Sequence, residues 1–433
     1  MEGGGDRRAE TPRAAGDQCR AARQRPVAGV VIAHVRFPRF PVAARATPLS
    51  RTLPPLYSPS PSIPDPGPEA RACSAALADS LHEEIIRAGG AISFSRYMER
   101  VLYTPELGYY SGGASKLGPT GDFTTAPEIS PLFGRCIARQ VEAVLEAIGG
   151  GAVLELGGGS GALAEAALAE AELDWRMLEP SAELRDRQRS RLGERVRWLD
   201  ALPREFRGVI LANEVADALP VERFTIHQGE PRRLGVQSEG AGFAWTLLPP
   251  EPEFAGVIHA LEIELGEAFP EGHRAEFSPM LHAWVRSLAD SLAAGLLLVI
   301  DYGLPRRELY GPERPDGTLI CHYRHRAHGD PFFWPGLQDL SAWVDFTAIA
   351  EAGVAAGLEL EGYTTQAAFL SGNGIDAMLQ ATGHDAAGIA EVQQAKRLLL
   401  PGELGERFRV IGLSRDLGPP LAGFGLLDLA NRL

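Results

Sequence analysis

From about residue 150 onward, short apolar runs alternate with helical patterns, and this alternation constrains the fold more than any other feature of the chain. Apolar runs this short suit strands that are covered on both faces of a parallel sheet. Helical patterns such as Ala162–Glu170 separate them, which predicts a doubly wound α/β sheet of the Rossmann type. The expected inner strands are Ala152–Leu156, Trp175–Leu178, 208–212 and 296–300, and the expected closing strands are 358–363 and 407–413.

The first 75 residues differ in composition from the rest of the chain. They are rich in Arg, Ala and Pro, and prolines crowd the stretch from Pro54 to Pro68. Proline at this density excludes helices and sheet ladders, so we expect a disordered extension over residues 1–75. An organelle-targeting peptide would share the Arg-rich composition, but acidic residues are present as well. We favour the alternative that the extension reflects an upstream start codon in an Arg-, Ala- and Gly-rich genome.

Residues 76–148 are expected to form an N-terminal helical and loop segment that completes the active site. Leu77, Leu81 and Ile85 recur at helical spacing, and a second helix is expected at Phe94–Tyr103. The α/β domain then occupies residues 149–433. Within it, two stretches exceed ordinary connections and are expected to form an inserted cap on the substrate side, namely 222–290 and 305–350.

Composition excludes several classes of function. A net charge of −14 over 433 residues argues against general affinity for nucleic-acid phosphates. The apolar runs are too short to cross a bilayer, so no membrane insertion is expected. No CxxC pair is present, and a metal site is not expected, because arginines interrupt a candidate group that matches no familiar ligand spacing: Cys321, His322, His325 and His328.

A glycine-rich turn follows the first expected inner strand and carries the sharpest local signal. Glu155 ends the strand, and Gly157, Gly159 and Gly161 open the next helix. Such a turn lets the backbone approach a ligand and presents free N–H groups at the helix N-terminus. A dinucleotide could use it, with Ala162 completing G-x-G-x-x-A. The arrangement E-x-G-x-G-x-G, which begins at Glu155, resembles the S-adenosylmethionine (SAM)-binding motif of class I methyltransferases. In that motif an acid helps to hold the cationic amino-acid end of SAM, whereas a carboxylate would repel a pyrophosphate, so we favour SAM.

Two further acids lie where an adenosine would need them. Glu179 ends the second expected strand, about 20 residues past the glycine turn, where an acid can accept both ribose hydroxyls. The position of Glu179 predicts a nucleoside ligand and does not choose between NAD and SAM. Asp200, two residues after Trp198, lies where methyltransferases often have an acid that accepts from the adenine amino group, and this similarity implies an adenine contact.

Polar residues also follow the third and fourth expected strands. Asn213, Glu214 and Asp217 come after the third strand, and Asp301 and Tyr302 come after the fourth. The carboxyl ends of parallel strands face the ligand crevice of such sheets, so we expect these side chains at the reaction centre, with Asn213 near the cofactor. Converging acids suit a cationic or proton-releasing nucleophile better than a phosphate.

From about residue 80 to its C-terminus the chain resembles the MidA-type SAM-dependent methyltransferases of bacteria and mitochondria. The resemblance implies a class I methyltransferase fold with SAM as cofactor. Its mitochondrial members are complex I assembly factors with protein-arginine methyltransferase activity, which implies a protein substrate. The compartment would be the cytoplasm for a bacterial protein or the mitochondrial matrix for a eukaryotic one. The blocks that carry the resemblance, besides the glycine turn, are SFSRYM at 93–98, PELGYY at 105–110, GDFTTAPEIS at 121–130, NEVADALP at 213–220, IDYG at 300–303, GLQDL at 336–340 and VDFT at 344–347.

If the substrate is an arginine, carboxylates must orient its guanidinium, which is not readily deprotonated in solution. We expect Glu214 to do this first, with Asp217, Asp301 and Glu128 behind it. Phe123 and Tyr302 are expected to wall the channel, and Phe123 and Thr125 to lie beside the cofactor. Two other readings are open at this point: an assembly factor that binds SAM or a partner without turnover, and a nucleotide-linked dehydrogenase.

Overall fold

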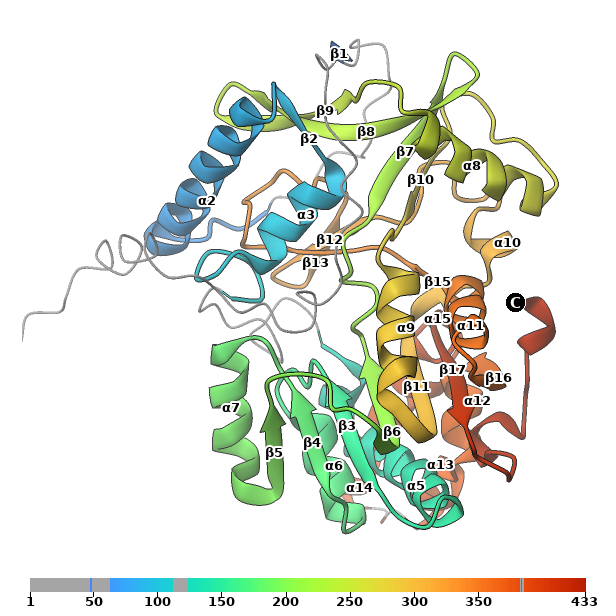
Figure 1. Cartoon of the computed structure of the whole chain (residues 1–433). Coiled ribbons are helices and arrows are strands. Elements are labelled where there is room, and N and C mark those ends of the chain that lie inside the picture. Colours follow the sequence, from blue (N-terminus) through green and yellow to red (C-terminus); the bar gives the residue numbers. More distant parts are fainter. Residues whose placement is uncertain (1–46, 49–62, 112–123, 382, 384) are drawn as a thin grey trace, which may run out of the picture.

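The computed structural model describes residues 47–48, 63–111, 124–381, 383 and 385–433. Figure 1 shows a lower α/β domain built on one large sheet, with a second group of strands and helices above it that we call the cap. Phe123, which was expected to wall the active site, lies outside the described residues. In the part of the chain that is described, no helix is long and apolar enough to cross a membrane.

The large sheet has the predicted doubly wound α/β architecture. Strands β11, β6, β3, β4 and β5 run parallel to one another, whereas β17 is antiparallel to both β11 and β16. In spatial order the strands are β16 (Glu359–Thr365), β17 (Phe408–Arg415), β11 (Leu292–Leu304), β6 (Phe206–Asn213), β3 (Ala152–Leu156), β4 (Trp175–Leu178) and β5 (Val196–Leu199).

The central strands are mostly apolar because both faces of the sheet are covered. Val153 and Leu298 belong to the core on one face, whereas Leu154 and Leu297 belong to the core on the other, as the two-residue period of a strand requires. The first face is covered by α5 (Pro131–Ala147), α6 (Ala162–Glu170), α12 (Gln366–Gly372), α13 (Ile375–Gln380) and α14 (Ala386–Leu399), and the second by α9 (Leu281–Ser291) and α11 (Phe346–Ala355).

Strand β11 is much longer than the expected 296–300, and Asp301 and Tyr302 lie inside it rather than after it. The extension is explained by pairing, because Gly303 and Leu304 form a parallel ladder with β15 (Val344–Asp345). Beside it, β6 extends to Asn213. The remaining elements of this domain are α4 (Ala126–Ile129), α7 (Ala182–Leu192), α10 (Arg306–Leu309) and α15 (Leu404–Arg407).

The cap combines the first expected insertion with the N-terminal segment, which local patterns did not predict. Strand β2 (Ala91–Ser93) pairs antiparallel with β8, so the segment before the glycine turn is part of the cap sheet. The other cap elements are α3 (Phe94–Tyr103), β7 (Glu222–His227), β8 (Glu230–Glu239), β9 (Gly242–Leu247), α8 (Pro252–Leu265) and β10 (Arg274–Phe277), with β1 (Thr47–Pro48) paired to β9. The second insertion adds a small sheet of β12 (Ile320–Tyr323), β13 (Arg326–His328) and β14 (Asp339–Ser341).

Helix α2 (Pro68–Arg87) begins within the segment that was expected to lack regular structure. The expected boundary at residue 75 is therefore too late by several residues. The reason is that Pro68 occupies the first turn of the helix, where a missing N–H costs no hydrogen bond. Leu77, Leu81 and Ile85 face the cap core, as their helical spacing predicted.

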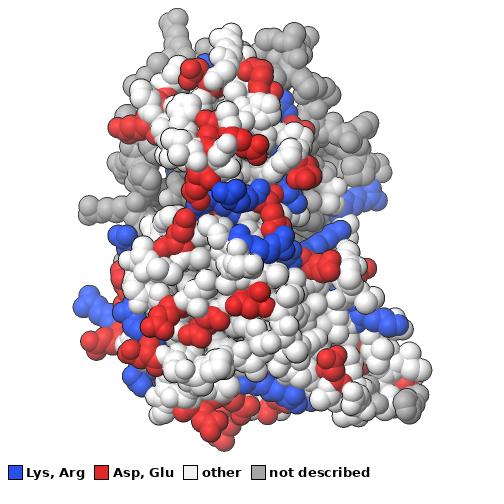
Figure 2. Space-filling view, turned by 90° about the vertical axis from the view of Figure 1, so that its right-hand side faces the viewer, with Lys and Arg blue, Asp and Glu red and all other residues white. Residues whose placement is uncertain are grey.

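The surface charge is mixed. On the face drawn in Figure 2, acidic and basic side chains are interspersed, and a cluster of basic side chains lies near mid-height where the cap meets the α/β domain. The drawn face thus shows small patches of either sign rather than one broad basic surface.

Candidate active site

The glycine turn lies between β3 and α6 and has the conformation of a ligand cradle. Gly157, Gly159 and Gly161 all have positive φ, at 59°, 54° and 81°. At Gly161, the N-cap of α6, a side chain would be strained by its φ and would meet Leu192 at 3.0 Å. The turn is held from outside by Arg191, whose Nη1 donates to the Ser160 carbonyl at 3.3 Å and to its Oγ at 3.0 Å.

Glu155 lies beneath this turn and is 3% exposed. Its Oε2 accepts a hydrogen bond from Trp175 Nε1 at 2.8 Å. Burial raises the pKa of Glu155 to about 8, and the charge of Glu179 adds to the rise. A cation bound beside it would reverse this effect, because an opposite charge favours the ionised carboxyl. The geometry therefore suits the amino-acid end of SAM.

Glu179 lies on the other side of the turn and is also 3% exposed. Its Oε1 accepts from Ser181 N at 2.9 Å, and its Oε2 accepts from Gln188 Nε2 at 3.0 Å. Gln188 also donates to the Gly159 carbonyl at 3.0 Å and accepts from Trp198 Nε1 at 2.8 Å. This network fixes the orientation of the Glu179 carboxylate next to the glycine turn. Ser181, Gln188 and Trp198 were not among the expected site residues, since contacts from neighbouring elements define them.

We expect Glu179→Gln to lower the affinity for S-adenosylhomocysteine about 10- to 100-fold, because a charged acceptor for the ribose hydroxyls is replaced by a neutral amide. Burial raises the pKa of Glu179 to about 7, so the carboxylate is lost as the pH falls through 7. Wild-type affinity should therefore fall between pH 8 and pH 6, and the Gln variant should show a smaller fall. Calorimetric titration at each pH measures this. Glu194→Gln, an exposed acid, is the control; equal affinities for wild type and Glu179→Gln would contradict the assignment.

Asp200 lies apart from this network. Its side chain is 85% exposed and pairs with Arg185 Nη1 at 2.8 Å. The expected contact to an adenine amino group stays a prediction for this residue. Trp198 is better enclosed, since Arg189 stacks over its ring at 5.5 Å and Gln188 bonds its indole.

Glu214 lies at the junction of β6 with the loop that follows and has a φ of 56°, which is unusual for a residue other than glycine. Its backbone N–H donates to the Ile300 carbonyl at 2.9 Å, so the bend is tied to β11. Its carboxyl accepts from Asn213 Nδ2 at 3.3 Å and from the backbone N–H of Ala126. Burial and the charge of Asp301 raise the pKa of Glu214 to about 8. Strained backbone of this kind concentrates at functional sites.

Asp301 has a different role from the one expected. It is fully buried, and its Oδ2 accepts from the backbone N–H groups of Val215, Ala216 and Asp217 at 3.2, 2.9 and 3.2 Å. Its Oδ1 accepts from its neighbour Tyr302 N at 2.8 Å. Because Asp301 is fully buried and four backbone N–H groups bond to it, its carboxylate is not exposed to a substrate. We therefore correct the expectation: Asp301 holds the loop that carries the acids.

Asp217 faces the cap, and the structure brings an acid there that was not predicted as a site residue. The pKa of Asp217 is raised well above its ordinary value by burial and by the charges of Asp301 and Asp339. Asp339 begins β14 and is 5% exposed. It lies in a block that carried the family resemblance, but only the packing of the cap places it beside Asp217.

The remaining expected residues divide between the two halves of the site. Glu128, on α4, accepts from Ser160 Oγ and lies 3.6 Å from Arg191 Nη1, so it belongs to the glycine turn rather than to the acid group around Glu214. Thr125 precedes α4, and its carbonyl accepts from Glu128 N at 3.0 Å. Tyr302 packs its ring on Phe408 with centroids 3.9 Å apart. Helix α4 therefore links the cofactor cradle, through Glu128, with the acid group, through Ala126.

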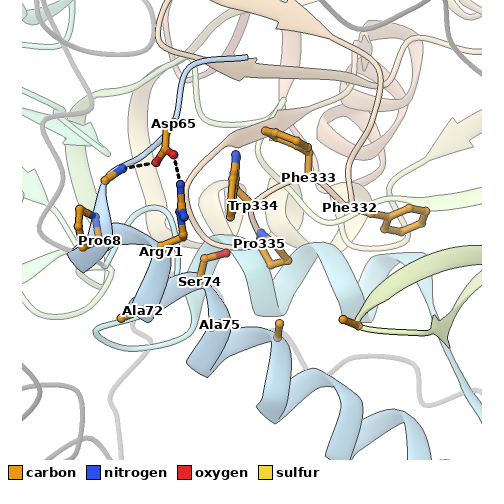
Figure 3. Close-up of a pocket in the computed structure, with 13 residues that line it drawn as sticks. Asp65, Pro68, Arg71, Ala72, Ser74, Ala75, Phe332, Phe333, Trp334 and Pro335 are labelled. Atoms are coloured by element: carbon orange, nitrogen blue, oxygen red, sulfur yellow. Dashed lines mark hydrogen bonds and ion pairs between the residues drawn. The ribbon is translucent and has the colours of Figure 1, made fainter. Parts of the chain in front are cut away.

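A separate hollow of about 1070 Å³ lies in the cap between α2 and residues 332–335. Figure 3 shows Arg71 paired with Asp65 and lying against Trp334. Its lining includes no residue of the glycine turn or of the strand ends, so we place the active site by its chemistry and not by this cavity.

Comparison with known proteins identifies the cofactor that the glycine turn binds. The model of a family of S-adenosyl-L-methionine-dependent methyltransferases (Methyltransf_28) matches residues 136–364, which is more than half of the chain. The chain belongs to this methyltransferase family. Its cofactor is accordingly SAM, and the dinucleotide reading of the glycine turn is set aside.

The methyltransferase is also similar to individual known proteins. A protein from Burkholderia thailandensis, solved with bound S-adenosyl-homocysteine, shares 44% identity and a TM-score of 0.82, with 86% of this chain and 100% of that chain covered. The mitochondrial protein arginine methyltransferase NDUFAF7 of Danio rerio is 27% identical over 83% of this chain and 96% of its own length. The NDUFAF7 homolog of Drosophila melanogaster is also 27% identical, over 70% of this chain and 75% of its own length.

The site of the methyltransferase fits SAM on its own geometry. The glycine turn has three glycines with positive φ, and Gln188 ties the Glu179 carboxylate to the Gly159 carbonyl of that turn. Asn213 Oδ1 is buried and finds no hydrogen-bond partner among the described residues, so an acceptor is available between the cradle and Glu214. Glu155, Glu179 and Asn213 would thus hold the cofactor. Among the described residues, no group of three or more His, Cys, Asp or Glu side chains is arranged to bind a metal ion.

Proposed function

We propose that this methyltransferase acts on a nitrogen of an arginine side chain in a protein. The observation that carries the proposal is the acid group formed by Glu214, Asp217 and Asp339. In the described part of the chain, no ion pair joins Glu214 or Asp217 to a lysine or arginine. Partly buried carboxyls whose pKa values are raised by neighbouring acids are suited to a cation supplied by the substrate. The names of the NDUFAF7 relatives support the same substrate class.

When bound, SAM supplies a sulfonium methyl that an in-line nitrogen nucleophile accepts, leaving S-adenosylhomocysteine. The protein has to align that nitrogen and control its proton. Glu214 lies next to Asn213 at the cofactor side, so its carboxylate receives one N–H of the guanidinium and takes the proton that the methylated nitrogen loses. Asp217 pairs with the rest of the cation. Asp301 positions both acids through the backbone of residues 215–217.

The proposal is tested with two peptide mixtures that differ only in a central arginine or lysine. The full chain is incubated with methyl-labelled SAM, and the products are identified by mass spectrometry. We expect label in the arginine mixture as methylarginine and at least 10-fold less in the lysine mixture, because a guanidinium presents a fork of donors to several carboxylates. Label in the lysine mixture alone, or in neither, would overturn the proposal.

We also infer that the protein works in a bacterial cytoplasm. The supporting observation is its 44% identity to the Burkholderia thailandensis protein against 27% to the mitochondrial NDUFAF7 relatives. Fractionation of the source cells tests this, and recovery with an organelle would overturn it.

A further inference from the structure

We propose that Asp339, on the cap strand β14, binds substrate together with Asp217 and makes the site select a guanidinium over an ammonium. The proposal rests on the arginine substrate proposed above and identifies the residue that would distinguish a planar guanidinium from an ammonium. The two carboxyl groups come from different parts of the fold, Asp217 from the loop after β6 and Asp339 from the cap.

Hydrogen bonds join the loop after β6 to the cap. Ala342 N, just after β14, donates to the Asp217 carbonyl at 3.2 Å. Tyr103 OH, at the end of α3, donates to the Ala218 carbonyl at 2.8 Å. The loop is therefore bonded to the cap at Asp217 itself and at the residue that follows it, which fixes the position of Asp217 relative to β14.

The side chain of Asp339 is oriented by two stacked tyrosines. Tyr110 OH donates to Asp339 Oδ1 at 2.9 Å. Tyr110 in turn stacks on Tyr103, with ring centroids 5.5 Å apart and planes at 23°. Both tyrosine pKa values are raised well above normal by burial and by the charges of Asp339 and Asp217, so both phenols stay protonated and can donate. Asp339 is thus a hydrogen-bond acceptor whose orientation is fixed by Tyr110.

Among the described neighbours of Asp339, two side chains on β12 are uncharged and two towards the α/β domain are acids. On the neighbouring strand β12, His322 is its register partner, and burial lowers the pKa of His322, so this imidazole is neutral near pH 7. Burial also keeps Cys321 as a thiol, by raising its pKa well above normal. Towards the α/β domain, Asp339 adds to the rise in the pKa of Asp217 and of Glu214. A substrate cation would relieve this mutual repulsion.

The shape of the arrangement favours a guanidinium. A guanidinium is planar and carries five N–H donors, so it can bridge Asp217 and Asp339 while one nitrogen remains directed at Glu214. A lysine ammonium is a compact point charge on a flexible side chain, and it can bind only one of the two carboxyl groups, Asp217 or Asp339, at a time. Selection for arginine would then depend on Asp339, whereas the transfer step would depend on Glu214.

The experiment compares the full chain with Asp339→Asn, Asp339→Glu and Tyr110→Phe, using the arginine and lysine peptide mixtures. We expect Asp339→Asn to raise KM for the arginine mixture about 10- to 100-fold with a smaller change in kcat, and to reduce the arginine-to-lysine preference. Asp339→Glu should recover part of the preference, and Tyr110→Phe should raise KM less than Asp339→Asn. Loss of the neighbouring charge lowers the pKa of Asp217, so the pH at which KM improves should move down.

Two further measurements separate substrate selection from a structural role. Affinity for S-adenosylhomocysteine and the thermal midpoint should be unchanged in Asp339→Asn, and Asp316→Asn, an exposed cap acid paired with Arg274, should behave as wild type. Unchanged KM and pH profile, or a joint fall of kcat, cofactor affinity and thermal midpoint, would overturn the role of Asp339. Absence of arginine methylation by the wild type would instead overturn the proposed function, and with it this inference.

Discussion

Replacing Glu214 by Gln should reduce kcat for arginine methylation about 100- to 1,000-fold while leaving the affinity for S-adenosylhomocysteine within a factor of two. The amide keeps the size of the side chain but loses the charge that orients the guanidinium and accepts its proton. Rates with the arginine mixture and calorimetric titration with S-adenosylhomocysteine measure the two effects. Glu230→Gln, an exposed cap acid, is the matched control. A Gln variant with wild-type kcat would remove Glu214 from the reaction.

The same residue predicts a pH dependence. Because burial and Asp301 raise the pKa of Glu214 to about 8, the free enzyme carries a neutral carboxyl at pH 6 and a carboxylate above pH 8. The ionised form is the one that binds a cation. Since kcat/KM reports the ionisation of the free enzyme, it should rise from pH 6 with a midpoint near pH 8 and level off above about pH 9, and the Gln variant should lose that rise.

Replacing Gly208 by Ala should lower the free energy of unfolding by about 3–5 kcal/mol, which combines overpacking with a strained backbone. Gly208 has a φ of 138°, and an added Cβ would lie 1.8 Å from the Ala152 carbonyl oxygen. This glycine lies where β6 pairs with β3 and β11, so the strands would have to separate. Urea unfolding of the purified chain measures the change.

The control for this prediction is Gly240→Ala. Gly240 has a φ of 60°, and an added Cβ would have no atom within 4 Å. Its cost should be the left-handed backbone penalty alone, about 1–2 kcal/mol. If the two variants lose equal stability, the close approach of β3 to β6 is not what requires glycine at position 208.

Local patterns in the sequence determined the central part of the methyltransferase domain. Strands β3 and β4 and helices α3 and α6 have the bounds that were predicted, because a strand covered on both faces is mostly apolar and polar or turn-forming residues follow it. The same patterns placed Glu155, Glu179 and Glu214 at strand ends. These predictions succeed because the hydrophobic periodicity of an element and the turn residues that end it lie within one short segment of the chain.

Only the tertiary structure decided which distant segments meet. The antiparallel direction of β17, the pairing of β2 with β8 and the extension of β11 by β15 depend on registers between residues far apart in the chain. The environment of Asp301 and the proposed role of Asp339 depend on such long-range pairings as well. The Asp301 carboxylate accepts hydrogen bonds from backbone N–H groups and supports a loop. Asp339 belongs to the cap and lies close enough to Asp217 to raise its pKa. Chemical type and strand-end position are local properties of the sequence, but the partner of a carboxylate is set by packing, and the partner determines its function.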